Sequence, residues 1–186
     1  DLSVTTESSE DSTEIHDWND LHATRNNLDG NYVLAADLDS DTAGYNTYVE
    51  NPENGWEPIG SESNPFTGSL NGNGHSIVEL IIDAPFDDSQ PGVGLFSSGQ
   101  DCNIKNISLK DIEINAGGGP VGGLIGSIFD VDGSSLLDIS VEGTIQATPK
   151  RESISGGVIG LVSTQDRMIE IRQITSNTDV KGLAAG

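Results

Sequence analysis

Basic side chains are scarce in this sequence. Only 8 Lys and Arg stand against 30 Asp and Glu, and the formal net charge is −22. Nucleic acids and anionic membranes attract proteins through clustered Lys and Arg, so this balance argues against both as partners. Arg151, Arg167 and Arg172 are too sparse to indicate a cleft for an anionic substrate. Three interpretations of the acidity stay open: a solvated surface adapted to high salt, sites for divalent cations, and an ordinary acidic surface.

Cysteine and long apolar runs are also nearly absent. Cys102 is the only cysteine, which excludes an internal disulfide, and its close neighbours include no base that lowers a thiol pKa. We therefore expect a buried, unreactive thiol. No run of 18 apolar residues occurs, so the sequence predicts no membrane span. The chain starts at Asp1 without methionine, and we expect a processed or excerpted piece for which targeting stays an open question.

Glycine, by contrast, is abundant, and a glycine-aliphatic motif recurs along the chain. It starts at Gly94, Gly123, Gly157 and Gly182, at steps of 29 (94 to 123), 34 (123 to 157) and 25 (157 to 182) residues. A period of this length is typical of arrays in which each repeat is one supersecondary unit. One such unit cannot bury an apolar face alone, so neighbouring units must stack.

The residue types of the motif fit such stacking. Glycine allows a positive φ at a corner and a close approach between neighbouring backbones. The aliphatic residues that follow then enter a strand. We expect Leu95, Leu124 and Val158 to stack as interior ladders, each side chain contributing roughly 1.5–3 kcal/mol on full burial.

This pattern resembles the GLUG repeat, found in parallel β-helical segments of large bacterial and archaeal surface proteins, with haloarchaeal proteins among the candidates. Gly123-Leu124-Ile125-Gly126 matches it fully, Gly157-Val158-Ile159-Gly160 has Val for Leu, and Gly94-Leu95-Phe96-Ser97 lacks the closing glycine. The wider resemblance runs from Trp18 to the end of the chain. It implies a right-handed parallel β-helix and brings no catalytic residues.

The domain organisation follows from composition and periodicity. Residues 1–13 are rich in Ser, Thr and acids and are expected to form a flexible lead-in. Residues 14–186 are expected to form one all-β domain, a right-handed parallel β-helix (solenoid) with a short N-terminal capping helix. Ile15, Trp18 and Leu21 recur at helical spacing and predict that capping helix over 14–27, with Thr13 as its N-cap. Irregular coils with long loops at 40–64 and 84–92 are expected over 28–92, and GLUG-type repeats over 93–186.

The C-terminal end of the repeats leads to a further expectation. Ile169, Ile171, Ile174 and Val180 are predicted to face the interior in the last complete repeat. Gly182-Leu183-Ala184-Ala185-Gly186 then restarts the motif with no strand residues after it. Open strand edges are templates for association. We therefore expect this end to be covered by further repeats of a longer chain or by a neighbouring identical subunit docked end-on.

Acidic residues offer two candidate metal sites. Asp37, Asp39 and Asp41 alternate as a strand runs into a loop, a spacing from which carboxylate oxygens can converge on a hard cation such as Ca²⁺. The stretch fails as an EF-hand loop because the sixth residue is Thr42 rather than glycine. Asp130 and Asp132 form a second, weaker candidate. With so many acids in the chain, ordinary solvated carboxylates remain the alternative for both.

The sequence also contains one N-glycosylation sequon and three histidines. Asn106 heads the sequon Asn106-Ile107-Ser108 and is the glycosylation acceptor to test in an exporting organism that glycosylates. His16, His22 and His75 are separated in the sequence, and we expect a structural role for each.

The sequence predicts a non-enzymatic extracellular or cell-surface module, a structural stalk or an adhesive domain adapted to high salt. Surface glycans and other cell-surface proteins are its expected ligands. A carbohydrate-active β-helix enzyme is the alternative, because acids are abundant enough to lie at glycosidase separations by chance. A subunit of an extracellular filament or virion appendage is a third possibility. Aromatic residues make up 5% of the chain, which favours the stalk.

Overall fold

The computed structural model describes residues 12–84, 92–130, 133–147, 154–164 and 169–182. Most of these residues lie in strands. The strands are β1 (Thr13–Ile15), β2 (Asn31–Leu34), β3 (Ser69–Asn71), β4 (Ser76–Val78), β5 (Ile81–Ala84), β6 (Phe96–Gly99), β7 (Asn103–Ala116), β8 (Pro120–Gly122), β9 (Ile125–Asp130), β10 (Ser135–Ala147), β11 (Ile154–Gly156), β12 (Ile159–Thr164) and β13 (Glu170–Gly182). Helical turns are short: α1 (Trp18–Ala23), the 3₁₀ turn η1 (Thr24–Asn26) and the π turn η2 (Asn46–Glu50).

All paired strands run parallel and form three sheets. The large sheet has eight strands in the order β1-β2-β3-β7-β10-β13, with β4 and β5 pairing further along β7. A second sheet has the order β12-β9-β6, and the third consists of β11 and β8. From β6 onward the chain visits the sheets in one repeated order, β6 to β7 to β8, then β9 to β10 to β11, then β12 to β13. The structure thus confirms two parts of the prediction, the mostly-β composition and the parallel pairing of the strands.

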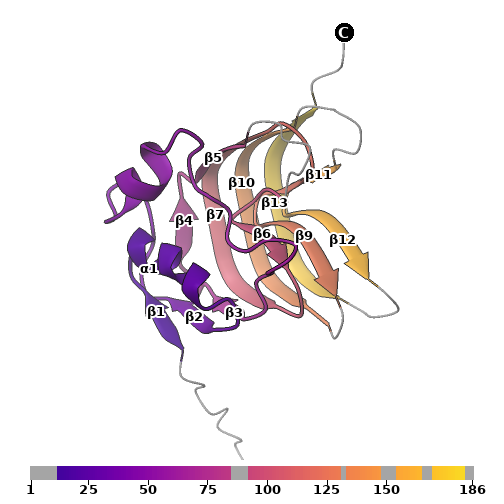
Figure 1. Cartoon of the computed structure of the whole chain (residues 1–186), viewed down its shortest axis with the longest axis horizontal. Helices are drawn as coiled ribbons and strands as arrows, with labels where there is room; N and C mark the ends of the chain where they lie inside the picture. The colour runs from indigo at the N-terminus through magenta and orange to yellow at the C-terminus, as the bar shows by residue number, and fades with distance from the viewer. Residues whose placement is uncertain (1–11, 85–91, 131–132, 148–153, 165–168, 183–186) are drawn as a thin grey trace, which may run out of the picture.

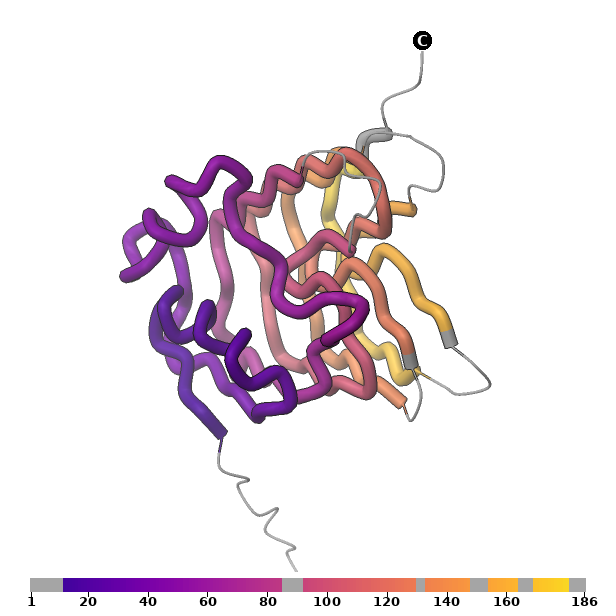
Figure 2. Tube along the Cα trace, viewed as in Figure 1, coloured from indigo at the N-terminus to yellow at the C-terminus, as the bar shows by residue number. Residues whose placement is uncertain are grey.

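Each pass through the sheets lies directly on the previous one (Figure 2). Ile104 of β7 pairs with Leu136 of β10, which pairs with Ile171 of β13. Ile114, Ile145 and Val180 form a second line of partners in the same three strands. Alternate residues of each strand face the interior, and β-branched side chains suit these stacked positions. The apolar core is therefore a set of ladders that run across the strands.

The large sheet bends at a line of residues with left-handed backbone. Asn106, Asp138 and Gln173 have φ of 54°, 55° and 52°. They precede Ile107, Ile139 and Ile174, which pair with one another. Asn and Asp tolerate this conformation better than other residues with a Cβ, which explains their presence at two of the three positions.

The capping helix is shorter than the sequence predicted. Thr13 is not its N-cap: it opens β1, which adds to the edge of the large sheet through the pairs of Thr13 with Tyr32 and Ile15 with Leu34. The helix begins at Trp18, and the Asp17 carboxylate accepts a hydrogen bond from the Asp20 backbone N–H at 2.9 Å. Strand pairing by Ile15 has overridden the helical spacing of the apolar residues.

The segment predicted as a long loop at 40–64 lies mostly at the surface but sends several apolar side chains into the core. It contains η2, and Tyr45, Val49 and Trp56 are buried in it. Its backbone makes isolated bridges to strands, among them Ile59 with Phe96. Together with α1 it covers the N-terminal end of the large sheet (Figure 1). Residues 1–11 of the lead-in predicted at 1–13, and most of the predicted loop at 84–92, lie outside the described residues, whereas Thr13 belongs to β1.

The two ends of the stack differ. At the N-terminal end Trp18 and Trp56 pack together at 5.6 Å between ring centroids, and both are buried. At the other end Ile171 and Val180 of β13, which were predicted to face the interior, are 45% and 41% exposed. Their partners Leu136 and Ile145 are fully buried. The last strand thus presents interior positions to solvent.

Candidate functional site

The glycine-aliphatic motif occupies equivalent places on successive passes. Leu95 N–H donates to the Gly123 carbonyl at 3.1 Å, and Gly123 N–H donates to the Gly157 carbonyl at 3.1 Å. Leu124 N–H donates to the Val158 carbonyl at 3.0 Å. Leu95, Leu124 and Val158 are all buried. The motif therefore joins one pass to the next through its backbone and fills the core with its aliphatic side chain.

Backbone proximity, rather than a positive φ, explains the glycines of the motif. A Cβ on Gly123 would lie 2.6 Å from Val141 Cγ1 and 2.8 Å from the Gly157 carbonyl oxygen. A Cβ on Gly126 would meet the backbone of Gly92 and Val93, and one on Gly160 would lie 2.6 Å from the Gly126 carbonyl oxygen. Contacts below 3.0 Å with backbone atoms leave little room for adjustment.

The predicted fourth copy of the motif, at Gly182, does not occupy the same place. Gly182 ends β13 and pairs with Ala147, which in turn pairs with Ala116 at the end of β7. The place of Gly123 and Gly157 lies between the third sheet and the second sheet instead. Long-range pairing, which the local motif does not encode, sets this difference, and residues 183–186 lie outside the described ranges.

The first candidate metal site does not assemble. Asp37 Oδ1 accepts a hydrogen bond from the Ser76 backbone N–H at 2.8 Å and lies 3.2 Å from His75 Nδ1. Asp39 Oδ1 accepts from the Thr42 hydroxyl at 2.7 Å and from the Asp41 backbone N–H at 3.1 Å. Asp39 thus fixes its own turn, whereas Asp37 holds the start of β4. In the part of the chain that the structure describes, no three His, Cys, Asp or Glu side chains gather closely enough to hold a metal ion.

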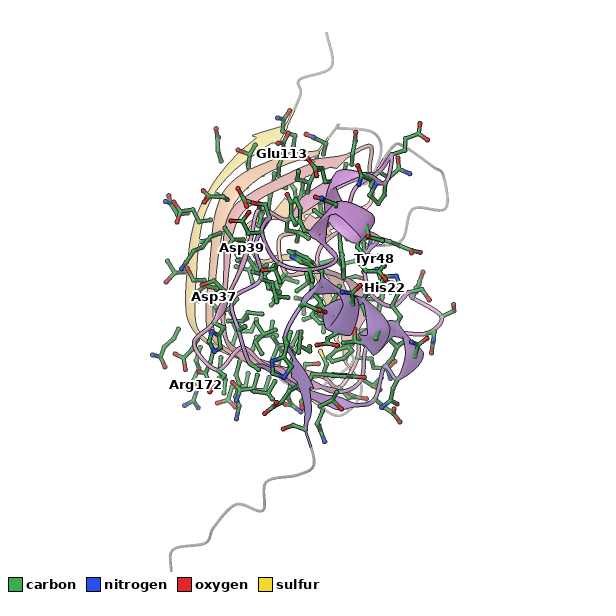
Figure 3. The ribbon with its side chains drawn as sticks, turned by 90° about the vertical axis from the view of Figure 1, so that its left-hand side faces the viewer. His22, Asp37, Asp39, Tyr48, Glu113 and Arg172 are labelled. Carbon is green, nitrogen blue, oxygen red and sulfur yellow. The ribbon has the colours of Figure 1, made fainter. Side chains whose placement is uncertain are left out.

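The electrostatics of Asp37 agree with this structural role. The hydrogen bond from the Ser76 N–H lowers the pKa of the Asp37 carboxyl, and His75 lowers it further, against a smaller effect of burial. His75 thus contacts the Asp37 carboxylate, which agrees with the structural role expected for this histidine. Figure 3 shows Asp37 and Asp39 beside the large sheet, on the other side of the view from His22 and Tyr48.

The second metal candidate is not described. Asp130 is the last residue of β9, and its side chain and the whole of Asp132 lie outside the described part of the structure. The prediction for this pair therefore stays a prediction, as does Ca²⁺ as its ligand.

Asn106, the sequon residue, is half-buried at the bend of β7. Its amide nitrogen, the atom that would carry a glycan, donates to Asn71 Oδ1 at 3.2 Å. Attachment would require this contact between neighbouring strands to break. The glycosylation prediction stays untested, but the bend gives the side chain a structural role of its own.

Sequence reasoning missed an aromatic and cationic cluster at the N-terminal end. His22 stacks on Tyr48 with ring centroids 4.1 Å apart and an interplanar angle of 15°. The Arg25 guanidinium lies 4.6 Å from the centroid of the buried Trp56 ring and donates to the Glu57 carbonyl. Figure 3 places His22 and Tyr48 together on this end. The helical spacing that located Trp18 could have indicated His22, but nothing local pairs it with Tyr48.

Burial also sets the charge state of this cluster. It lowers the pKa of His22, and the nearby Arg25 cation lowers it further. Burial likewise lowers the pKa of Arg25, whereas the Glu57 carboxylate opposes that change. Both effects favour the neutral form of the His22 ring that stacks on Tyr48.

A polar cleft of about 460 Å³ adjoins this cluster. Its lining includes the side-chain amides of Asn26, Asn27, Asn64 and Gln100, with Arg25 and Asp29 as charged residues. Amide groups both donate and accept hydrogen bonds, which matches hydroxyl-rich molecules better than ions. The cleft thus offers hydrogen-bond donors and acceptors to hydroxyl groups.

Comparison with known proteins finds similarity to two much longer proteins. The chain is 32% identical over 152 residues to Halomucin of Haloquadratum walsbyi, an alignment that covers 81% of this chain and 2% of Halomucin. It is 33% identical over 125 residues to a "Putative Gly-rich membrane protein" of Evansella cellulosilytica, with 66% of this chain and 13% of that protein covered. This chain therefore spans a small part of either relative.

No family model matches the chain, so the resemblance to the GLUG repeat rests on the residues alone. No solved structure matches it either. Among the described residues, the helices are too short to form an apolar span across a bilayer.

Proposed function

We propose that this chain is a segment of a right-handed parallel β-solenoid and acts as a non-enzymatic structural or adhesive module at the cell surface. The observation that carries the proposal is the register. Interior aliphatic residues of successive passes pair across parallel strands, such as Ile107, Ile139 and Ile174 in the large sheet, and Ile125 with Ile159 between β9 and β12. Parallel strands joined by crossovers are almost always right-handed. A column of stacked coils is a rigid spacer, which suits a surface protein.

High salt is the proposed working environment. The outward positions of the large sheet carry acids such as Asp111, Glu113 and Glu142, all exposed. A net charge of −22 on a chain of this length repels itself, and salt screens that repulsion. The similarity to Halomucin of Haloquadratum walsbyi, a haloarchaeon, supports the same environment and a place at the cell surface.

The non-enzymatic role is supported by how the polar groups are used. The Asp39 carboxylate fixes its own turn, the Asp37 carboxylate holds the start of β4, and His22 stacks on Tyr48 rather than meeting an acid. For the adhesive function we propose surface glycans as ligands, in the amide-lined cleft beside Arg25. The scarcity of basic residues speaks against nucleic acids and anionic membrane surfaces as partners.

The proposal predicts that stability rises with salt. The Debye length falls from roughly 10 Å at 0.1 M to 3 Å at 1 M, so self-repulsion of the acidic surface falls with it. We expect the melting midpoint of residues 1–186 to rise by about 5 °C or more between 0.1 M and 1 M NaCl, measured by circular dichroism. An unchanged midpoint would contradict adaptation to high salt.

A matched variant separates charge screening from the general effect of salt on apolar burial. Replacing Asp111→Asn, Glu113→Gln and Glu142→Gln changes the net charge from −22 to −19 (−22 plus 3) without altering the core. This triple variant should gain stability at 0.1 M and depend less on salt. A neutral triple on the same strands, Asn115→Gln, Thr144→Ser and Gln146→Asn, should behave as the unmodified chain does.

A further inference from the structure

Exposed apolar side chains gather at one end of the stack. The large hydrophobic residues that stand exposed in the described chain are Ile154, Val162, Ile171 and Val180, with 41–45% of each accessible. They belong to β11, β12 and β13, the last strand of each sheet. We call this surface the β13 end. An exposed apolar cluster of this kind marks an interaction surface more often than a solvated one.

Register shows that at least three of these side chains occupy core positions. Val162 pairs with Ile128, Ile171 with Leu136, and Val180 with Ile145, and all three partners are fully buried. The ladders that fill the interior therefore continue to the β13 end and stop there uncovered.

The strand edges at the β13 end also indicate an interaction surface. Among the described strands, β13 pairs only with β10, β12 only with β9, and β11 only with β8. At this end of the stack, the last strand of each sheet therefore has an edge that pairs with no other described strand. A partner that satisfies these edges together must present three parallel strands in the same cross-section.

The opposite end of a second copy does not meet this requirement. There α1 and η2 lie over the end of the stack (Figure 1). Trp18 of α1, Val49 of η2 and the neighbouring Tyr45 are buried in the core. At that end isolated bridges from Leu38, Gly55, Ile59 and Val93 already meet the edges of β4, β5, β6 and β8. The outermost strand there is β1, which has three residues. A head-to-tail contact between copies would leave most of the β13 end unpaired.

We propose that the β13 end is the seat of a further parallel coil with the same three-sheet cross-section, contributed by the longer protein to which this chain belongs. The inference rests on the proposed solenoid and names its partner. The length of the relatives supports it, because this chain spans 2% of Halomucin and 13% of the second relative.

The β13 end also specifies the chemistry of that coil. Aliphatic residues belong over Val162, Ile171 and Val180. Between the two β13 residues lie the Ser176 and Thr178 hydroxyls, 3.0 Å apart, and Ser176 pairs with the inward-facing Val141. The covering coil must bring a small or polar residue to this point, because an aliphatic one would bury two hydroxyls beside a group that cannot accept hydrogen bonds.

Two double variants of β13 test the proposal. Ile171→Lys with Val180→Lys places charges on the inward line, and Thr175→Lys with Asn177→Lys places the same charges on exposed outward positions of the same strand. Both are introduced into residues 1–186 and into the full-length protein that carries this chain. Melting midpoints and amide hydrogen exchange of β13 are measured in each.

In the full-length protein we expect the inward pair to lower the midpoint of this module by about 10 °C or more relative to the outward pair. In residues 1–186 alone the two pairs should agree within about 2 °C. The β13 amides should exchange at least about 100-fold more slowly in the full-length protein than in residues 1–186.

Three outcomes would overturn the proposal. One is equal midpoints for the two pairs in the full-length protein. Another is reversible self-association of residues 1–186 that the inward pair abolishes, since a second copy would then cover the β13 end. The third is a full-length protein that contributes no further coil. If the outward pair lowers the midpoint of residues 1–186 by more than the inward pair does, the inward and outward assignment fails, and with it the solenoid itself.

Discussion

Replacing Gly126 with valine is expected to prevent folding or to cost more than about 4 kcal/mol of unfolding free energy. A Cβ at this position would fall on the backbone of Gly92 and Val93, which belong to the preceding pass. Backbone atoms in a stacked sheet cannot rotate away as a side chain can, so relief requires the passes to separate. Thermal and urea unfolding followed by circular dichroism measure the loss.

Gly126→Ala is the milder variant, used where the valine variant leaves no folded protein to measure, and it should lose stability in the same direction. Ser140→Val is the matched control. Ser140 is half-buried on the outward face of β10, between Ser108 and Thr175 in the register, where a β-branched residue fits the sheet. It should stay within about 0.5 kcal/mol of the unmodified chain. Equal loss in Gly126→Ala and Ser140→Val would contradict the stacked arrangement.

Removing the indole of Trp18 should destabilise the domain nearly as much. Trp18 is fully buried, donates from Nε1 to the Asp39 carbonyl at 2.9 Å, and packs against Tyr45 and Trp56. Truncation to alanine leaves a cavity where the helix closes the stack. We expect a loss of about 3–5 kcal/mol in unfolding free energy, measured by urea denaturation.

Asn19→Ala is the control for the helix itself. Asn19 is exposed on α1 and makes one side-chain hydrogen bond, to Asp17. Its replacement tests whether the helix or the buried indole matters, and it should change stability by no more than about 0.5 kcal/mol. A Trp18→Ala variant as stable as Asn19→Ala would show that the N-terminal end of the stack needs no cover.

Local patterns in the sequence predicted stacked strands, because glycine and β-branched residues report directly on close backbone approach and stacking, and the resemblance to the GLUG repeat implied that the strands run parallel. The motif at Gly123 and Gly157 was located for this reason. The same local pattern failed at Gly182, whose place in β13 is set by its pairing with Ala147, 35 residues earlier (182 minus 147). Register is a property of two strands, and one segment does not contain it.

The candidate sites show the same limit. Alternating carboxylates predicted convergence at Asp37 and Asp39, yet Asp37 is held by the N–H of Ser76, 39 residues further along the chain. Trp56 lies in a stretch with the composition of a loop, and its burial depends on Trp18, which the sequence places elsewhere. Composition predicts which residues are polar or apolar, but the partner that uses each one comes from the fold.

The central claim is that the passes stack in parallel and in register, and one distance tests it directly. Val33, Asn71, Lys105, Leu137 and Arg172 are successive partners across β2, β3, β7, β10 and β13. Spin labels at Val33→Cys and Arg172→Cys, with the buried Cys102 replaced by alanine, are therefore separated by four strand spacings. Pulsed electron paramagnetic resonance should give one distribution centred at about 20 Å, since adjacent strands lie about 4.8 Å apart. A broad distribution, or one centred beyond about 35 Å, would contradict the stacked column.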